Sequence, residues 1–181
     1  EGENDNIFAT MLYYTLYIDK IGKTGFRTRE EAISTLRDYP LFVKEIRELC
    51  EYLIYQISNK TFAVGEGMPS MLEQYGCYTR EEVFTIFGRQ TIDKRMQGSV
   101  AGVFKIEELN TELFFVTLNK SEKDFSPSTQ YNDYVVSEKQ FHWQSQNTDS
   151  HQHSGSRFVN QQINKKKFLL FVREYKRDGF G

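Results

Sequence analysis

The sequence predicts an α+β fold, with a helical N-terminal part over residues 1–98 and a β-rich part over residues 99–181. Up to about residue 100, apolar side chains recur every three or four positions, the period of an amphipathic helix. Beyond that point, short aromatic and β-branched runs alternate with turn-rich loops, a pattern typical of strands. With 39% hydrophobic and 15% aromatic residues among 181, the chain has enough apolar side chains to pack one domain or two small ones.

The first 57 residues are expected to form three helices. The first covers residues 6–20 and the third covers residues 41–57, each with apolar residues on one face. The second begins at Thr28, where Glu31 three residues on forms a capping box that satisfies two orphan amide donors. Pro40 bars the continuation of this second helix, because proline lacks the amide hydrogen that a helix interior needs.

A fourth expected helix begins at Thr79, where Glu82 completes a second capping box. Gly88 ends it, because glycine readily adopts the left-handed backbone found after a helix C-terminus. The residues around the two capping boxes do not match, so they do not indicate a repeat. The first half therefore predicts a small helical bundle.

The second half is expected to contain strands. Its strand-like segments are residues 102–108, 112–119, 133–137, 139–146, 156–162 and 166–175. Since no long helical crossover separates them, an antiparallel, barrel-like sheet is favoured over a doubly wound one. The chain starts at Glu1 rather than at Met and stops soon after its last strand, so we expect a fragment of a longer protein whose β part is incomplete.

Charge is unevenly distributed along the chain. The net charge is −2, yet residues 154–181 contain seven Lys or Arg against two acids. This basic end is compatible with a nucleic-acid partner, which the net charge alone disfavours. The stretch NKKKF, residues 164–168, either binds phosphate or charges an edge strand against aggregation.

Several classes of function are disfavoured. The apolar runs are far shorter than the ~20 residues that span a bilayer, and no leader opens the chain, so we expect a soluble, cytoplasmic protein without a membrane partner. Cys50 and Cys77 lack CxxC spacing, and three histidines, His142, His151 and His153, are too few for a metal site. No nucleophile motif or phosphate-binding glycine loop is recognisable, so we expect a binding domain without catalytic residues.

The stretch FHWQSQN, residues 141–147, concentrates hydrogen-bonding groups around the only tryptophan. In a strand, Phe141 and Trp143 would share one face, while the row His142, Gln144 and Gln146 would share the other. Either the aromatic pair is core and the polar row is a solvated face, or the row reads base edges. Glutamine favours the second interpretation because its amide offers a donor and an acceptor in one plane, and a nearby aromatic ring gives a base a surface to stack on.

The preceding loop, residues 119–134, is too long for a simple hairpin, and loops of that length in compact domains are usually functional. Tyr131 or Tyr134 would stack on a base, unless they are core residues with satisfied hydroxyls. Asp133 or Asp124 would accept a hydrogen bond from an exocyclic amine. Candidate phosphate donors in the loop are Lys120, Lys123, Ser126, Ser128 and Thr129.

The block from Leu113 to Asn147, with SGSRFVNQ and FLLFVRE after it, resembles the C-terminal domain that follows DEAD/DEAH-type helicase domains in bacterial helicase-nucleases. MLYYTLY and YTREEVFTIFG are similar to the helical part of that domain. Members with a phospholipase D-like nuclease include ATP-dependent type IV restriction enzymes of the SauUSI type. The resemblance implies an SRA-like β part that binds double-stranded DNA carrying 5-methylcytosine or 5-hydroxymethylcytosine. It also implies that ATP and Mg²⁺ serve the parent enzyme, with no cofactor in this fragment.

A reader of this kind is expected to flip the modified cytosine out of the duplex, because a single methyl group is best discriminated in a fitted pocket. The stacking would come from Tyr131, Tyr134 or Trp143, and Asp133 would accept from the exocyclic amine. The contacts to the base edge or backbone would come from His142, Gln144 and Gln146. Beyond the loop, the phosphate contacts would come from Arg157, Lys165, Lys166 and Lys167.

An alternative from a different class is a structural domain that couples helicase and nuclease modules or makes the parent enzyme a homodimer. FHWQSQN would then be buried scaffold, and the amphipathic N-terminal helices would form the protein contact surface. Stable dimerisation without DNA affinity would favour this alternative.

Overall fold

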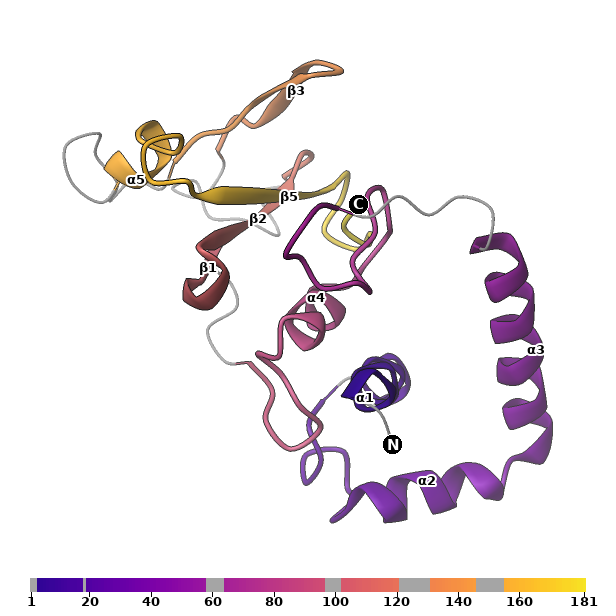
Figure 1. The fold of residues 1–181 in the computed structure, drawn as a ribbon. Helices are drawn as coiled ribbons and strands as arrows, with labels where there is room; N and C mark the ends of the chain where they lie inside the picture. The colour runs from indigo at the N-terminus through magenta and orange to yellow at the C-terminus, as the bar shows by residue number, and fades with distance from the viewer. Residues whose placement is uncertain (1–2, 18, 58–63, 97–101, 121–130, 146–154) are drawn as a thin grey trace. The chain divides into compact units, whose positions relative to one another are not determined.

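The computed structural model describes residues 3–17, 19–57, 64–96, 102–120, 131–145 and 155–181 (Figure 1). The chain divides into two compact units, Glu1–Gln97 and Gly98–Gly181. The first is helical and the second contains small sheets, which confirms the predicted α+β class.

The first unit contains the four expected helices: α1 Glu3–Tyr17, α2 Arg29–Arg37, α3 Pro40–Ile57 and α4 Arg80–Ile86. Pro40 both prevents α2 from continuing and opens α3, because the first turn of a helix needs no amide hydrogen from that residue. Gly88 follows α4 with φ +65°, and the amide of Arg89 reaches back 2.7 Å to the carbonyl of Phe84. The predicted glycine cap is therefore present.

The two predicted capping boxes differ in detail. At α4, the Thr79 side chain accepts from the Glu82 amide at 3.1 Å, and the Glu82 carboxylate accepts from the Thr79 amide at 2.6 Å. At α2, Thr28 accepts from the Glu31 amide at 3.2 Å, but the Glu31 carboxylate takes the amide of Arg27 instead, at 2.7 Å. The side chains satisfy amides at both helix starts, but only α4 has a complete capping box.

Aromatic residues form the core of the first unit. Tyr13, Tyr14, Ala32 and Ile92 are buried together, and Tyr17, Ile21 and Phe26 pack against them. The rings of Tyr13 and Tyr14 meet edge to face at 5.4 Å, and those of Tyr17 and Phe26 do so at 5.2 Å. This cluster joins α1 to α2 and to the segment after α4.

The second unit contains a three-stranded sheet and a separate hairpin. β1 Val103–Ile106 runs antiparallel to β2 Thr111–Thr117, and β5 Lys167–Arg173 lies on the other side of β2, parallel to it. Within the part of the chain that the structure describes, β3 Tyr134–Ser137 and β4 Gln140–His142 pair antiparallel only with each other. Among the described residues there is no closed barrel, so the barrel-like antiparallel sheet expected from the sequence is not confirmed.

The expectation of an all-antiparallel sheet is wrong because the chain between β2 and β5 acts as a crossover. Residues 156–162, expected as a strand, instead begin with the short helix α5, Ser156–Val159, followed by turns. Periodicity over so few residues does not separate strand from helix. Within α5, Phe158 packs against the rings of Phe114, Trp143 and Phe168 at 5.0–5.9 Å.

β2 is the centre of the second unit, and all seven of its residues are buried. Phe114 faces α5 and Trp143, while Phe115 points to the opposite side and contacts Phe171 and Phe180. Gly181 exchanges two backbone hydrogen bonds with Val172 of β5, at 2.9 and 2.8 Å. The sheet is therefore covered on both faces, which explains why β2 reads as a nearly continuous apolar run.

Candidate nucleic-acid interface

The β3–β4 hairpin is anchored at its base by a buried ion pair. The Lys120 ammonium, which follows β2, lies 2.6 Å from the Asp133 carboxylate and also donates to the Tyr131 carbonyl at 2.7 Å. The other Asp133 oxygen accepts from the backbone amide of Gln144 at 2.9 Å. The Gln144 side-chain oxygen in turn accepts from the amide of Asn132 at 3.0 Å. These bonds connect the residues before β3 and after β4 to Lys120, just beyond the end of β2.

Asp133 therefore has a structural partner on each carboxylate oxygen. Its side chain is 4% exposed and that of Lys120 is 9% exposed, so each charge compensates the other out of water. The sequence predicted Asp133 as an acceptor for a base and Lys120 as a phosphate donor. The geometry gives both residues a role in positioning the hairpin instead.

Beyond this anchor, the hairpin presents apolar and aromatic side chains to solvent. Tyr134 and His142 are cross-strand partners, and their rings stack with centroids 4.6 Å apart at 23°. Tyr134 is 46% exposed, His142 is also exposed, and Val135 and Val136 beside them are more exposed still. The hairpin thus exposes an aromatic stack, Tyr134 on His142, and two valines, Val135 and Val136, none of which is buried in the core.

Trp143 is placed differently from its neighbours in FHWQSQN. β4 ends at His142, so the alternation expected over residues 139–146 does not extend to Trp143. Its ring meets Phe114 at 4.7 Å and Phe158 at 5.0 Å, both edge to face. Trp143 is therefore part of the aromatic core over β2, as the core interpretation of the sequence allowed, and we remove it from the set of base-stacking candidates.

Two of the predicted phosphate ligands are engaged by a carboxylate that the sequence analysis did not single out. Glu112, fully buried within β2, lies 3.1 Å from the Arg157 guanidinium and 3.0 Å from the Lys166 ammonium. The contact with Lys166 is a charge contact, because that carboxylate oxygen makes no hydrogen bond among the described residues. An acid inside the apolar run TELFFVT was the available signal, since a buried charge needs a partner.

The remaining predicted site residues fall into two groups. Lys165 and Lys167 are exposed beside the start of β5, and Tyr131 is half-buried with the Lys120 ammonium 5.6 Å from its ring centre. The others lie outside the described residues: Lys123, Asp124, Ser126, Ser128, Thr129, Gln146, His151 and His153.

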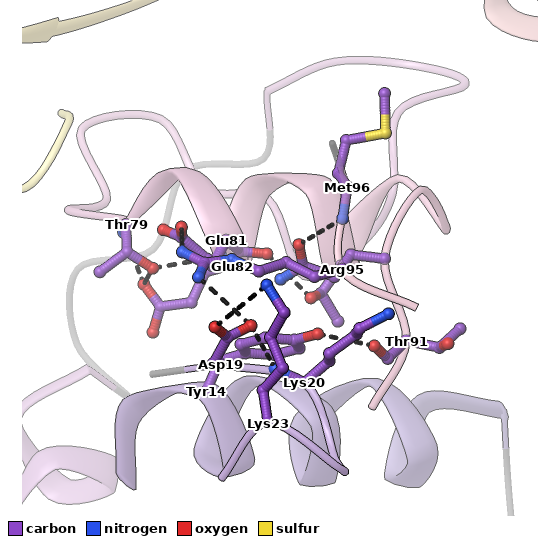
Figure 2. Close-up of polar contacts among 12 residues, drawn as sticks. Tyr14, Asp19, Lys20, Lys23, Thr79, Glu81, Glu82, Thr91, Arg95 and Met96 are labelled. Atoms are coloured by element: carbon purple, nitrogen blue, oxygen red, sulfur yellow. Dashed lines mark hydrogen bonds and ion pairs between the residues drawn. The ribbon is translucent and has the colours of Figure 1, made fainter. Parts of the chain in front are cut away.

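A second polar cluster, shown in Figure 2, lies in the first unit and joins α1 to α4. Arg95 contacts Glu81 at 2.7 Å and Asp19 at 3.6 Å, and the hydrogen bond with Glu81 raises the pKa of Arg95. The Tyr14 hydroxyl donates to the Thr91 carbonyl at 2.9 Å, and burial raises the pKa of Tyr14 to about 12. The Lys20 amide lowers the pKa of Asp19. Each polar group named here has a partner within the unit, so we interpret the cluster as structural.

Two features are absent among the described residues. They include no group of three or more His, Cys, Asp or Glu side chains placed to hold a metal ion. No helix within the described ranges has the length and apolar character needed to cross a bilayer.

The fold and site define an α+β protein with an exposed aromatic hairpin on a small mixed sheet. The chain belongs to a domain family of unknown function, DUF3427, whose model matches residues 72–180, more than half of the chain. No curated protein and no solved structure matches it. The matched range covers α4 and nearly all of the second unit, including the hairpin.

Proposed function

We propose that this chain is a DNA target-recognition domain that binds double-stranded DNA carrying 5-methylcytosine or 5-hydroxymethylcytosine. The observation that carries the proposal is the exposed stack of Tyr134 and His142 on the β3–β4 hairpin. A base that stacks on a surface aromatic ring gains roughly 1–3 kcal/mol. The choice of modified cytosine rests on the resemblance to type IV restriction enzymes.

A two-stranded ribbon suits this target. The major groove admits a β-ribbon, and the methyl group at cytosine C5 lies in that groove. Val135 and Val136, both exposed, would make apolar contacts in that groove. Extruding the base costs a few kcal/mol, which stacking on Tyr134 and His142 would largely offset.

The polar contacts would come from Gln144 beside the hairpin and from lysines near β5. The Gln144 side-chain oxygen is engaged by Asn132, which leaves the amide NH₂ to donate to an acceptor on the base edge. Lys165 and Lys167, both exposed, would contact phosphates, together with Lys123 outside the described residues. The domain would act as a binding module, while ATP and Mg²⁺ would serve helicase and nuclease modules of a parent enzyme.

The test is fluorescence anisotropy with a duplex that carries one 5-methylcytosine in each strand and the same duplex unmodified, over a salt series. Wild-type chain is expected to prefer the modified duplex, and the preference is expected to survive higher salt because base contacts release no counterions. Tyr134→Ala should weaken binding to the modified duplex by roughly 5- to 150-fold, the equivalent of one lost stacking contact.

Tyr175→Ala is the matched control, because Tyr175 belongs to the same unit and is 44% exposed against 46% for Tyr134. It should leave both affinities unchanged. Equal affinity of the wild type for both duplexes would contradict recognition of the modified base. If Tyr134→Ala and Tyr175→Ala lowered the affinity for the modified duplex equally, the hairpin would not be the DNA contact.

A further inference from the structure

The outer edge of the three-stranded sheet is open along β5. β5 lies at one end of the strand order β1–β2–β5, and among the described residues β2 is the only strand that pairs with it (Figure 1). Residues 168–172, FLLFV, contain neither a charge nor a proline, the residues that commonly keep an edge strand from pairing. Leu170, in the middle of this run, is 42% exposed.

The backbone groups on this edge can be located from the end of the chain. The amide and the carbonyl of Val172 both bond to Gly181, at 2.9 and 2.8 Å, so they point away from β2. Backbone groups of successive strand residues alternate in direction, and those of Leu170 and Phe168 therefore point to the same outer side. Within the described ranges, neither residue has a backbone partner on that side.

The bonds between Val172 and Gly181 also give the direction of an added strand. Two residues that exchange both backbone hydrogen bonds form a hydrogen-bonded pair of an antiparallel ladder. A strand in line with Gly181 would continue that ladder toward the start of β5. Its next hydrogen-bonded positions lie opposite Leu170 and then Phe168, whose amides and carbonyls are in place to receive it.

Charge at the start of β5 defines the chemistry of the added strand. Lys165 and Lys167 are exposed there, whereas Lys166 between them is compensated by Glu112 at 3.0 Å. An antiparallel strand brings its C-terminal end to these lysines. Opposite charges that face each other across a ladder are stabilising, so acidic residues at that end suit the site.

The other edge of the sheet is less suited to a partner. β1 has only four residues, and its exposed Lys105 pairs with Glu107 at 2.8 Å. A short edge strand with a lysine in it opposes pairing with another chain. The contrast leaves β5 as the edge of this sheet that can accept a strand.

We propose that the outer edge of β5 binds an extended peptide segment of a partner protein as an additional antiparallel strand, in line with Gly181. The peptide exchanges backbone hydrogen bonds with Leu170 and Phe168, places apolar side chains beside theirs, and carries acids at its C-terminal end. The inference does not depend on the DNA-binding proposal, because no residue of the β3–β4 hairpin takes part.

The first test is amide hydrogen exchange of the free 181-residue chain, followed by NMR. The Leu170 and Phe168 amides should exchange at least about tenfold faster than those of Leu169 and Phe171, which point toward β2. Slow exchange at all four amides would show that another segment of the same chain covers the edge, and it would overturn the proposal.

The second test is fluorescence anisotropy with a labelled peptide TVTVTEE, in which the valines face the outward groups of β5. N-methylation of both valines should weaken binding by roughly tenfold or more, because it removes the amide hydrogens directed at Leu170 and Phe168. N-methylation of the second threonine is the control, since its amide points away. The reversed peptide, EETVTVT, should also bind more weakly, because its acids lie far from the lysines.

A pair of chain variants tests the location. Leu170→Asp should weaken binding of TVTVTEE by roughly tenfold or more, because it places a charge in the edge. Val136→Asp is the matched control, since Val136 belongs to the same unit, is 54% exposed and lies on the hairpin. It should leave the affinity within about twofold of the wild type.

Three further results would overturn the proposal. The first is no binding of TVTVTEE at millimolar concentration by a chain whose Leu170 and Phe168 amides exchange freely. The second is equal affinity for the peptides methylated at valine and at threonine, which would mean that the backbone of the peptide is not recognised. The third is an equal loss in Leu170→Asp and Val136→Asp, which would place the contact elsewhere.

Discussion

β2 and β3 are built from the same kinds of residue but end in opposite environments. β2 reads TELFFVT and is buried at all seven positions, whereas β3 reads YVVS and is exposed at all four. β2 has a strand on each side and a layer on each face, while among the described segments β3 pairs only with β4. Both segments are rich in residues that favour strands, but only β2 lies in a core. The apolar residues of β3 are available for a partner.

The two buried carboxylates extend this comparison. Glu112 within β2 is contacted by Arg157 and Lys166, whereas Asp133 at the base of the hairpin is contacted by Lys120. Both use basic residues that the sequence suggested for DNA phosphates. A basic residue close to a binding surface can therefore serve the fold, and only its contacts distinguish the two roles.

The largest expected effect breaks the core side of the comparison. Glu112→Ala should lower the free energy of unfolding by about 3–5 kcal/mol, because it leaves two cations without their buried partner. Denaturant unfolding measures it. Glu138→Ala, an exposed acid in the hairpin turn, is the control and should change stability by less than about 0.5 kcal/mol. Similar values for the two variants would contradict the structural role of Glu112.

Trp143→Ala should lower the free energy of unfolding by about 3 kcal/mol, because the indole packs on Phe114 and Phe158 but keeps some exposure. Thermal and denaturant unfolding of the variant would show the loss. A stable variant with impaired DNA binding would instead return Trp143 to the base-contact set.

Asp133→Ala should lower the free energy of unfolding by about 2 kcal/mol, because the Lys120 ammonium and the backbone amide of Gln144 lose their shared acceptor. The hairpin should be loosened most. Amide hydrogen exchange would accelerate in β3 and β4 and stay slow in β2. Asp133→Asn, which keeps the shape of the side chain, should accelerate exchange less. If exchange in the hairpin stayed at the wild-type rate in Asp133→Ala, the anchor would not be what holds it.

Tyr134→Ala should change stability least, by no more than about 1 kcal/mol, which is the upper value of one cross-strand pair. Chemical unfolding followed by circular dichroism tests this. A loss as large as that expected for Trp143→Ala would mean that the hairpin stabilises the fold, and the contrast between β2 and β3 would fail.

Local signals predicted much of this structure. The helices follow from spacing and caps, since Thr79 with Glu82 and the glycine after α4 act within a few residues. The strands β1, β2 and β5 were recognisable because their residues are β-branched or aromatic over four to seven positions. The family match adds a domain description but no function.

The features that sequence patterns missed depend on distant contacts. The parallel order of β2 and β5 depends on a crossover that contains α5, and four residues are too few to show a helical period. For Trp143 the sequence left a core and a base-stacking interpretation open, and the contact with Phe158 from another segment favours the core. Likewise, the partners of Glu112 lie 45 or more positions away along the chain, and no spacing rule connects them.

We propose that the exposed hairpin, rather than the three-stranded sheet, contacts modified DNA. The most direct test is an NMR titration of the isotope-labelled chain with the 5-methylcytosine duplex, with the unmodified duplex as the control. The account predicts that the largest shift changes occur at Tyr134, Val135 and His142, are specific to the modified duplex, and leave the β1–β2 pairing unchanged. Shift changes confined to other segments, or identical changes with both duplexes, would contradict it.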